Sequence, residues 1–421
     1  MFRRSRAVLI ASIAAVAVVA SLTVSASASA PTSASASASA ETTTRNDAVQ
    51  RVLDWAVSEH GAPGILAEVQ NGSSRWFGSA GVADTSTGRK LAPYDRYRIG
   101  STTKTFTATV LLQLVGERLL SLDDTVEKWL PGVVKGNGHD GSAITVRQLL
   151  NHTSGIFNYT SHSAIRTKLV GQGFIDHRFD SVRPEDLVKT AMSHAPDFTP
   201  GTSWAYSNTN FVLAGMIAEK ASGHSFATEV TRRIIVPLGL SHTYLPREST
   251  GIAGAHGRGY SKLMLADPAA PVHDVTEMSA TWGGSAGDMI STSGDINRFY
   301  GALLKGRLLR PAEQEAMFTA VPTVNWIPDT GYGLGVMGQK LSCGVRAWGH
   351  GGTIHGSLSW SMGLRDGSKV ASTNMNGDWV DQGGISEAVM EAVFCPGTGA
   401  SAGTGQERAS TAPAPHPLQL S

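Results

Sequence analysis

The chain has 421 residues, of which 41% are hydrophobic and 16% are charged. This composition is typical of a globular protein and excludes a largely disordered chain. Lys and Arg together number 35, against 34 Asp and Glu. A balance so close to neutrality gives no reason to expect a nucleic acid or an anionic membrane surface as a partner.

The first thirty residues have the pattern of a secretory signal peptide. Three arginines precede an apolar run over residues 7–24, and small residues continue to Ala30. This order predicts that residues 1–30 are removed during export and that the mature protein is secreted and extracellular. The neighbouring Arg3 and Arg4 leave the general and the twin-arginine export routes both open.

Two further segments are predicted to be flexible. Residues 31–46 and 397–421 are rich in Ser, Ala, Thr, Gly and Pro, and they offer almost nothing to bury. The second segment shows no hydrophobic terminus, so no membrane anchor is expected. No stretch after residue 30 reaches the roughly 18 consecutive apolar residues that a membrane span needs.

Between these segments, apolar periodicity predicts an α+β domain over residues 47–396. The strand signals lie near both ends of the domain, whereas helices and loops dominate residues 121–279. This order predicts an antiparallel sheet flanked by helices, with an inserted, mainly helical subdomain at about residues 121–279. The expected elements outside that subdomain are strands Gly64–Gln70 and Tyr97–Gly100, helix Ser101–Leu120, strands Val345–His350, Ser357–Leu364 and Lys369–Asn376, and helix Ile385–Phe394.

Ser101 and Lys104 are the first candidates for chemistry. A serine hydroxyl needs a base within hydrogen-bond reach, and on a helix the side chain three residues later lies on the same face. This pair is the one Ser-x-x-Lys in the chain. Burial can lower the pKa of a lysine from ~10.4, so that its neutral amine serves as the base. The alternative is an ordinary helix start with a solvated lysine.

Tyr206-Ser207-Asn208 supplies the second candidate pair, at the start of a predicted helix. It is the one Tyr-x-Asn in the chain. A phenol beside a Ser/Lys pair can relay a proton to a leaving group. The Asn208 amide can hold a substrate carbonyl while it binds the lysine. The alternative is a tyrosine packed at a loop-to-helix junction, with Asn208 as the helix cap.

The third candidate is His350-Gly351-Gly352-Thr353, at the end of a predicted strand. Glycine at position 352 lets the backbone of a substrate lie against the strand. The backbone N–H of Thr353 can then complete an oxyanion hole together with that of Ser101. These motifs imply neither a metal nor an organic cofactor, since the thirteen histidines show no zinc-ligand spacing.

Cys343 and Cys395 are the two cysteines of the chain. In an exported protein, one disulfide between them is the simplest interpretation. The alternative is a pair of buried free thiols.

In this order and spacing, the three motifs resemble the serine penicillin-recognising superfamily. The most similar members are soluble D-alanyl-D-alanine carboxypeptidases, with class C β-lactamases and related esterases nearby. The resemblance covers about residues 47–396 and includes ITVRQLLNHTSG, YSNTNF, SAGD and LSCG. It implies a β-lactamase/transpeptidase-like fold and an acyl-serine intermediate. It also implies a peptidoglycan stem peptide or a small acyl substrate, with β-lactams as acylating inhibitors.

The resemblance further implies a role for each motif residue. The implied set is the nucleophile Ser101, the base Lys104, the proton-relaying Tyr206 with Asn208 beside it, His350 where many relatives have lysine, and a disulfide between Cys343 and Cys395.

Two positions depart from the carboxypeptidase pattern. Gly351 stands where those enzymes usually have a hydroxyl residue, and Met337–Lys340 lacks the arginine that helps to hold the terminal carboxylate of the substrate. Strand alternation puts Arg346 on the face of His350, either as a replacement or as a solvated edge charge. Trp282, beside SAGD, is expected either to line the pocket or to belong to the core.

Two other interpretations compete with a penicillin-recognising enzyme. GGSAG around Ser285 matches the nucleophile elbow of α/β-hydrolases, but the HGG stretch follows this serine instead of preceding it. A receptor that binds penicillin or peptides without turnover is the other, and the intact Ser101, Lys104 and Tyr206 argue against it. The sequence therefore predicts a D-alanyl-D-alanine carboxypeptidase, with a β-lactamase or an esterase as the alternative.

Overall fold

The computed structural model describes residues 33–396 and confirms the predicted α+β fold. The predicted signal peptide over residues 1–30 and the predicted tail over residues 397–421 lie outside the described residues. The chain divides after Thr42 into two units, and of the first unit only the beginning of helix α1 is described. Apart from these first residues of α1, all features below belong to the second unit. Within the described part of the chain, no helix has the length and apolar character needed to cross a membrane.

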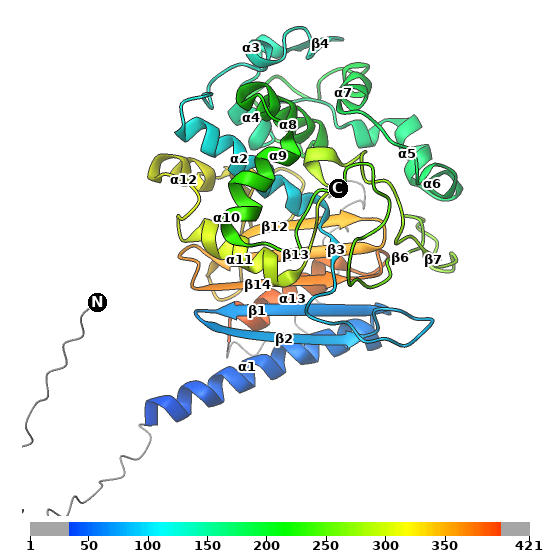
Figure 1. Ribbon diagram of the computed structural model, residues 1–421, viewed down its shortest axis with the longest axis vertical. Coiled ribbons are helices and arrows are strands. Elements are labelled where there is room, and N and C mark those ends of the chain that lie inside the picture. Colours follow the sequence, from blue (N-terminus) through cyan, green and yellow to red (C-terminus); the bar gives the residue numbers. More distant parts are fainter. Residues whose placement is uncertain (1–32, 397–421) are drawn as a thin grey trace, which may run out of the picture. The chain divides into compact units, whose positions relative to one another are not determined.

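An eight-stranded antiparallel sheet joins the two ends of the domain (Figure 1). Its strand order is β2-β1-β14-β13-β12-β11-β10-β9, so the first strands of the domain pair with the last ones. In the β1–β14 pair, Ile65 lies opposite Met375. The strands are β1 (Gly64–Asn71), β2 (Ser74–Gly81), β9 (Val321–Pro322), β10 (Thr330–Tyr332), β11 (Met337–Lys340), β12 (Arg346–Ile354), β13 (Ser357–Leu364) and β14 (Lys369–Met375).

Residues 121–279 contain most of the helices, as Figure 1 shows for α3 to α8 above the sheet. Short strand pairs also occur: β3 (Tyr97–Arg98) with β8 (Ile290–Ser291), β4 (Lys135–Gly136) with β5 (His139–Asp140), and β6 (Tyr260–Ser261) with β7 (His273–Asp274). The helices are α1 (Ser33–Ser58), α2 (Thr103–Gly116), α3 (Val126–Trp129), α4 (Val146–Leu150), α5 (Ser163–Leu169), α6 (Gln172–His177), α7 (Pro184–Met192), α8 (Asn208–Ser222), α9 (Phe226–Val230), α10 (Val236–Leu238), α11 (Ser293–Leu304), α12 (Pro311–Phe318) and α13 (Gln382–Phe394).

The two faces of the sheet bury different helices because side chains alternate along each strand. On one face, Ile65 and Met362 belong to an apolar cluster that includes residues of α1 and α13. On the other face, Leu66 and Val370 belong to a larger cluster with residues of α2, α8 and α11. The candidate site residues lie on the side of α2 and α8.

Helix α1 overlaps a segment that the sequence predicts to be flexible. The sequence predicts a flexible segment over residues 31–46, whereas α1 begins at Ser33 and continues to Ser58. Alanine has the highest helix propensity, and neither Gly nor Pro occurs between Ser33 and Ser58. Because propagation of a helix is easier than its nucleation, the helix can extend backwards from the buried positions at Val49 and Leu53.

Ser101 lies just before the long helix that the sequence predicts to begin there. A short 3₁₀ turn, η1 (Gly100–Thr102), leads from β3 into α2. Gly100 has a φ of 48°, and a Cβ at this position would lie 2.8 Å from the backbone nitrogen of Thr353. Glycine therefore permits both the turn and the close approach of η1 to β12.

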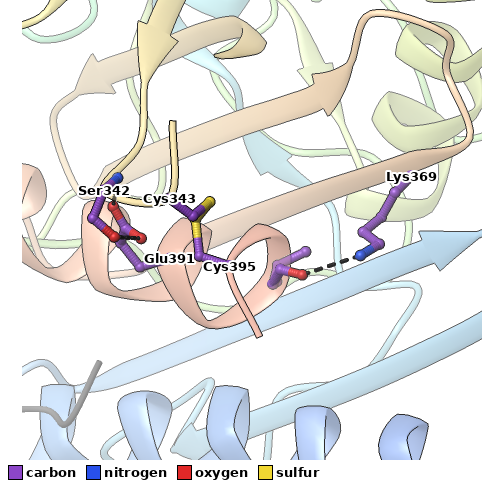
Figure 2. Close-up of a disulfide and its surroundings, with 6 residues drawn as sticks. Ser342, Cys343, Lys369, Glu391 and Cys395 are labelled. Carbon is purple, nitrogen blue, oxygen red and sulfur yellow. Dashed lines mark hydrogen bonds between the residues drawn. A yellow bond between two sulfur atoms is a disulfide. The ribbon is translucent and has the colours of Figure 1, made fainter. Parts of the chain in front are cut away.

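Cys343 and Cys395 form a disulfide that ties the loop after β11 to the end of α13, as Figure 2 shows. Beside it, Glu391 accepts hydrogen bonds from the backbone N–H of Ser342 at 2.7 Å and from its hydroxyl at 2.6 Å. Lys369 donates to the carbonyl of Val393 at 3.3 Å. The predicted disulfide is confirmed, and together these contacts hold the last turns of α13 on the sheet.

Candidate active site

Lys104 lies at the centre of the candidate site. Its Nζ is 2.8 Å from Ser101 Oγ, 2.7 Å from Asn208 Oδ1 and 2.8 Å from the carbonyl oxygen of Ala286. These partners come from η1, α8 and the turn η5 (Gly284–Ala286). Lys104 is fully buried, and burial holds the pKa of its ammonium well below the usual range.

The partners of Lys104 fit a neutral amine. The carbonyl oxygens of Asn208 and Ala286 can only accept hydrogen bonds, so they take the two N–H groups of the amine. In the neutral form of the amine, a lone pair is then left for the hydroxyl proton of Ser101, whose Oγ lies 2.8 Å from Nζ. A serine whose proton points at a neutral amine is the arrangement that nucleophilic catalysis needs. The alternative of a solvated lysine at a helix start does not fit this burial.

Tyr206 precedes α8, and the centre of its ring lies 4.9 Å from Lys104 Nζ. Burial raises the pKa of the phenol above its usual range, and a hydrogen bond to Ser101 acts in the opposite direction. The phenol therefore stays protonated at neutral pH and can donate a proton. Asn208 Nδ2 is buried and has no hydrogen-bond partner among residues 33–396, so it can donate to the carbonyl of a substrate.

Gly352 and Thr353 bring β12 against η1. A Cβ on Gly352 would collide with the carbonyl oxygen of Ile99, so glycine is required for this approach. The nitrogen of Thr353 lies beside Gly100, the residue before Ser101. The backbone N–H groups of Ser101 and Thr353 thus belong to adjacent segments, as an oxyanion hole built from the two requires.

Gln382, the first residue of α13, holds the opposite face of β12. Thr353 Oγ1 donates to Gln382 Oε1 at 2.7 Å. Gln382 Nε2 donates to the carbonyl oxygens of Gly352 and Ser359, both at 3.1 Å. The sequence identified Thr353 for its backbone N–H and missed Gln382, because no local pattern links two residues on different elements.

His350 is bonded to a residue that the sequence did not identify. Its Nδ1 lies 2.6 Å from the carbonyl oxygen of Gly351, and its Nε2 lies 2.8 Å from the hydroxyl of Tyr332. A carbonyl can only accept, so Nδ1 carries the proton and Nε2 accepts from Tyr332. Burial, with a smaller effect from Lys104, lowers the pKa of His350 to about 3. The imidazole is therefore neutral, unlike the lysine of many relatives.

His152 is another residue that the sequence analysis did not identify as part of the site. It is fully buried and has a φ of 64°, a conformation that is uncommon for residues other than glycine. Its Nδ1 accepts from the backbone N–H of Ser207 at 3.2 Å and from Asn210 Nδ2 at 3.1 Å, and its ring centre lies 4.4 Å from that of Tyr206. Its place in the NHTSG stretch was the one available signal.

The side chains of three other sequence candidates make packing or structural contacts. Trp282 is 9% exposed and packs in an apolar cluster with Ile354, which fits the core role that the sequence left open. Arg346 is exposed and donates to the carbonyl of Gly338 at 2.8 Å. Ser285 donates to the carbonyl of Phe211 at 2.8 Å, a structural contact that does not fit a nucleophile elbow.

The ring of Trp360 explains why glycine occupies position 351. A Cβ on Gly351 would collide with this ring, which packs in the cluster on the α13 face of the sheet. A hydroxyl residue would need the ring to move.

Within the described residues, no three His, Cys, Asp or Glu side chains gather as metal ligands would.

Comparisons with known proteins agree with this geometry. The family model described as Beta-lactamase matches residues 45–374. Penicillin-binding protein 4* of Bacillus subtilis is 28% identical over 286 residues, which make up 65% of this chain and 59% of that protein. This chain thus matches less than two thirds of the length of that relative.

Two solved structures are similar over most of the chain. A D-stereospecific amidohydrolase from Streptomyces sp. is 51% identical with a TM-score of 0.78, over 83% of this chain and 98% of that one. A D-amino acid amidase from Ochrobactrum anthropi SV3, complexed with L-phenylalanine amide, is 26% identical with a TM-score of 0.73 over the same shares. With its β-lactamase/transpeptidase-like fold, this chain belongs to the Beta-lactamase family of serine hydrolases.

Proposed function

We propose that this protein hydrolyses amide and ester bonds at the carbonyl of a D-configured residue, through an acyl intermediate on Ser101. The observation that carries the proposal is the contact between Ser101 Oγ and Lys104 Nζ at 2.8 Å, with two obligate acceptors on the lysine. The D-stereospecific amidohydrolase that is 51% identical supports the choice of substrate.

The proposed mechanism begins with attack of Ser101 Oγ on the substrate carbonyl carbon, while Lys104 Nζ takes the hydroxyl proton. The oxyanion accepts hydrogen bonds from the backbone N–H groups of Ser101 and Thr353. When the bond to the leaving group breaks, Tyr206 donates its proton to the departing nitrogen or oxygen, and Lys104 returns a proton to Tyr206. Water then attacks the acyl-serine and restores the free hydroxyl.

In this mechanism His350 and His152 are positioning residues. His350 binds Tyr332 and the backbone of β12, and His152 binds the loop that carries Tyr206. Both imidazoles are buried, and burial lowers the pKa of each below the usual range, so neither brings a positive charge into the site at neutral pH. In this mechanism only Lys104 and Tyr206 transfer protons.

A D-alanyl-D-alanine carboxypeptidase is the second candidate, which the penicillin-binding name of the Bacillus subtilis relative favours. That reaction needs a cation for the terminal carboxylate of the peptide. His350 is neutral, and Arg346 lies four residues earlier on β12, about 13 Å along the strand. Because no cation lies at the position of His350, we rank the carboxypeptidase second.

For either activity we propose export of the protein, supported by the pattern of residues 1–30 and by the disulfide.

The test compares D-phenylalaninamide, L-phenylalaninamide and an acetylated peptide ending in D-Ala-D-Ala, with the Ser101→Ala variant as the control. We expect hydrolysis of the D-amide, little hydrolysis of the L-amide, and no activity in the variant. Release of D-alanine without amide hydrolysis would favour the second candidate. An active Ser101→Ala protein would contradict the assignment of the nucleophile. Intact mass after addition of a penicillin, with peptide mapping, then locates any acyl adduct.

A further inference from the structure

Four aromatic rings lie together beside the candidate proton donor. The centre of the Trp326 ring lies 5.9 Å from that of Tyr206 in a stacked arrangement with an interplanar angle of 20°. It also lies 5.1 Å from the ring of Trp204 and 5.7 Å from that of Tyr332. Trp204 and Tyr332 are buried, whereas Tyr206 and Trp326 are half-buried. The rings of Tyr206 and Trp326 are therefore the more exposed part of the cluster, although their polar atoms are buried.

Trp326 is carried by the loop between β9 and β10, and side chains close this loop at its base. Thr323 Oγ1 lies 3.1 Å from Thr330 Oγ1, and Thr330 Oγ1 donates to the carbonyl of Ile327 at 2.6 Å. At the tip, Val324 is 48% exposed. The loop thus holds Trp326 against Tyr206, while Val324, two residues earlier in the same loop, is exposed to solvent.

We propose that Trp326 forms an apolar wall of the subsite for the leaving group and favours substrates whose leaving group is aromatic. This inference rests on the proposed function, in which Tyr206 protonates the leaving group. A proton donor acts within about 3 Å of the atom that it protonates. The leaving group therefore lies next to the hydroxyl of Tyr206. The half-buried ring that stacks on this phenol is that of Trp326.

The chemistry of the wall favours a planar apolar group over a charged one. Aromatic rings pack at centroid distances of about 4.5–7 Å in offset or edge-to-face geometry. An aryl leaving group can extend the stack that Tyr206 and Trp326 already form. The neutral His350 provides no charge that would favour an anionic leaving group instead.

The experiment compares two substrates with the same D-phenylalanyl group, the p-nitroanilide and the amide, in wild-type protein and in the Trp326→Ala variant. Val324→Ala, an exposed change on the same loop, is the matched control. We expect Trp326→Ala to lower kcat/KM for the p-nitroanilide by about tenfold and for the amide by less than twofold. Trp326→Phe should restore most of the loss, and Val324→Ala should change neither value.

Equal losses on both substrates, or no loss on either, would overturn the inference, because a purely structural role cannot distinguish the leaving groups. Thermal unfolding of each variant separates a folding defect from a loss of recognition, and Trp326→Phe keeps the test valid if the alanine variant is unstable. If the wild-type protein hydrolyses both substrates and Trp326→Ala affects them equally, the inference about Trp326 is wrong and the proposed function still stands. A wild-type protein that hydrolyses neither overturns the proposed function and this inference with it.

Discussion

Replacement of Gly352 by alanine is a sharp test of the proposed oxyanion hole. The new Cβ would collide with the carbonyl oxygen of Ile99, so β12 must move away from η1 by about 1 Å. That movement separates the N–H of Thr353 from the N–H of Ser101. Removal of one oxyanion-hole donor costs about 10²–10³ in rate. We therefore expect Gly352→Ala to slow acylation by at least about a hundredfold.

The assay is the rate of acylation by a penicillin or by an aryl ester, measured by intact mass or by absorbance well below the melting temperature of each variant. Gly351→Ala is the matched control, because its Cβ would collide with the ring of Trp360 on the other face of the same strand. We expect Gly351→Ala to lower Tm while acylation falls much less than in Gly352→Ala. Near wild-type acylation in folded Gly352→Ala would refute the reasoning about the oxyanion hole.

The remaining predictions concern proton transfer, positioning and stability. Tyr206→Phe should lower turnover by about 10²-fold or more with little change in Tm, and a variant that simply unfolds would indicate a packing role instead. The acylation rate should rise with pH through the pKa of Lys104, since only the neutral amine accepts the proton. Its midpoint should lie well below ~10.4, and a midpoint near that value would contradict the burial argument. His152→Asn, which tolerates the left-handed backbone, should lower kcat about tenfold with a small change in KM; an equal rise in KM would favour direct substrate contact. Cys343→Ser removes a cross-link between residues 52 positions apart and should lower the free energy of unfolding by about 4 kcal/mol, measured by urea unfolding; a loss below about 1 kcal/mol would show that α13 is held by its other contacts.

Local patterns in the sequence determined the elements that carry the site. Ser101 and Lys104 are three residues apart, and a helical turn brings such side chains together wherever the rest of the chain lies. Strand β13 was predicted with the bounds that the structure gives it, because apolar residues alternate with serines along it, Gly356 precedes it and a turn sequence ending at Gly367 follows it. The antiparallel sheet followed from strand signals near both ends of the domain, and the disulfide from the two cysteines of the chain.

Other features were decided only when distant segments packed together. The second and third partners of Lys104 lie 104 and 182 residues further along the chain. The bond between Tyr332 and His350, and the stacking of Trp326 on Tyr206, likewise join separate elements. No periodicity or spacing encodes such contacts, because they depend on how close two elements approach.

The segment over residues 31–46 that the sequence predicts to be flexible overlaps helix α1. Its composition gives no apolar face, but a helix that starts on the buried positions of α1 can extend backwards to Ser33. The sequence by itself thus determined the family, the fold class and the Ser–Lys pair, because each rests on short local patterns and on their order along the chain. The lowered pKa values of Lys104 and His350 were decided by burial, which only the tertiary structure creates.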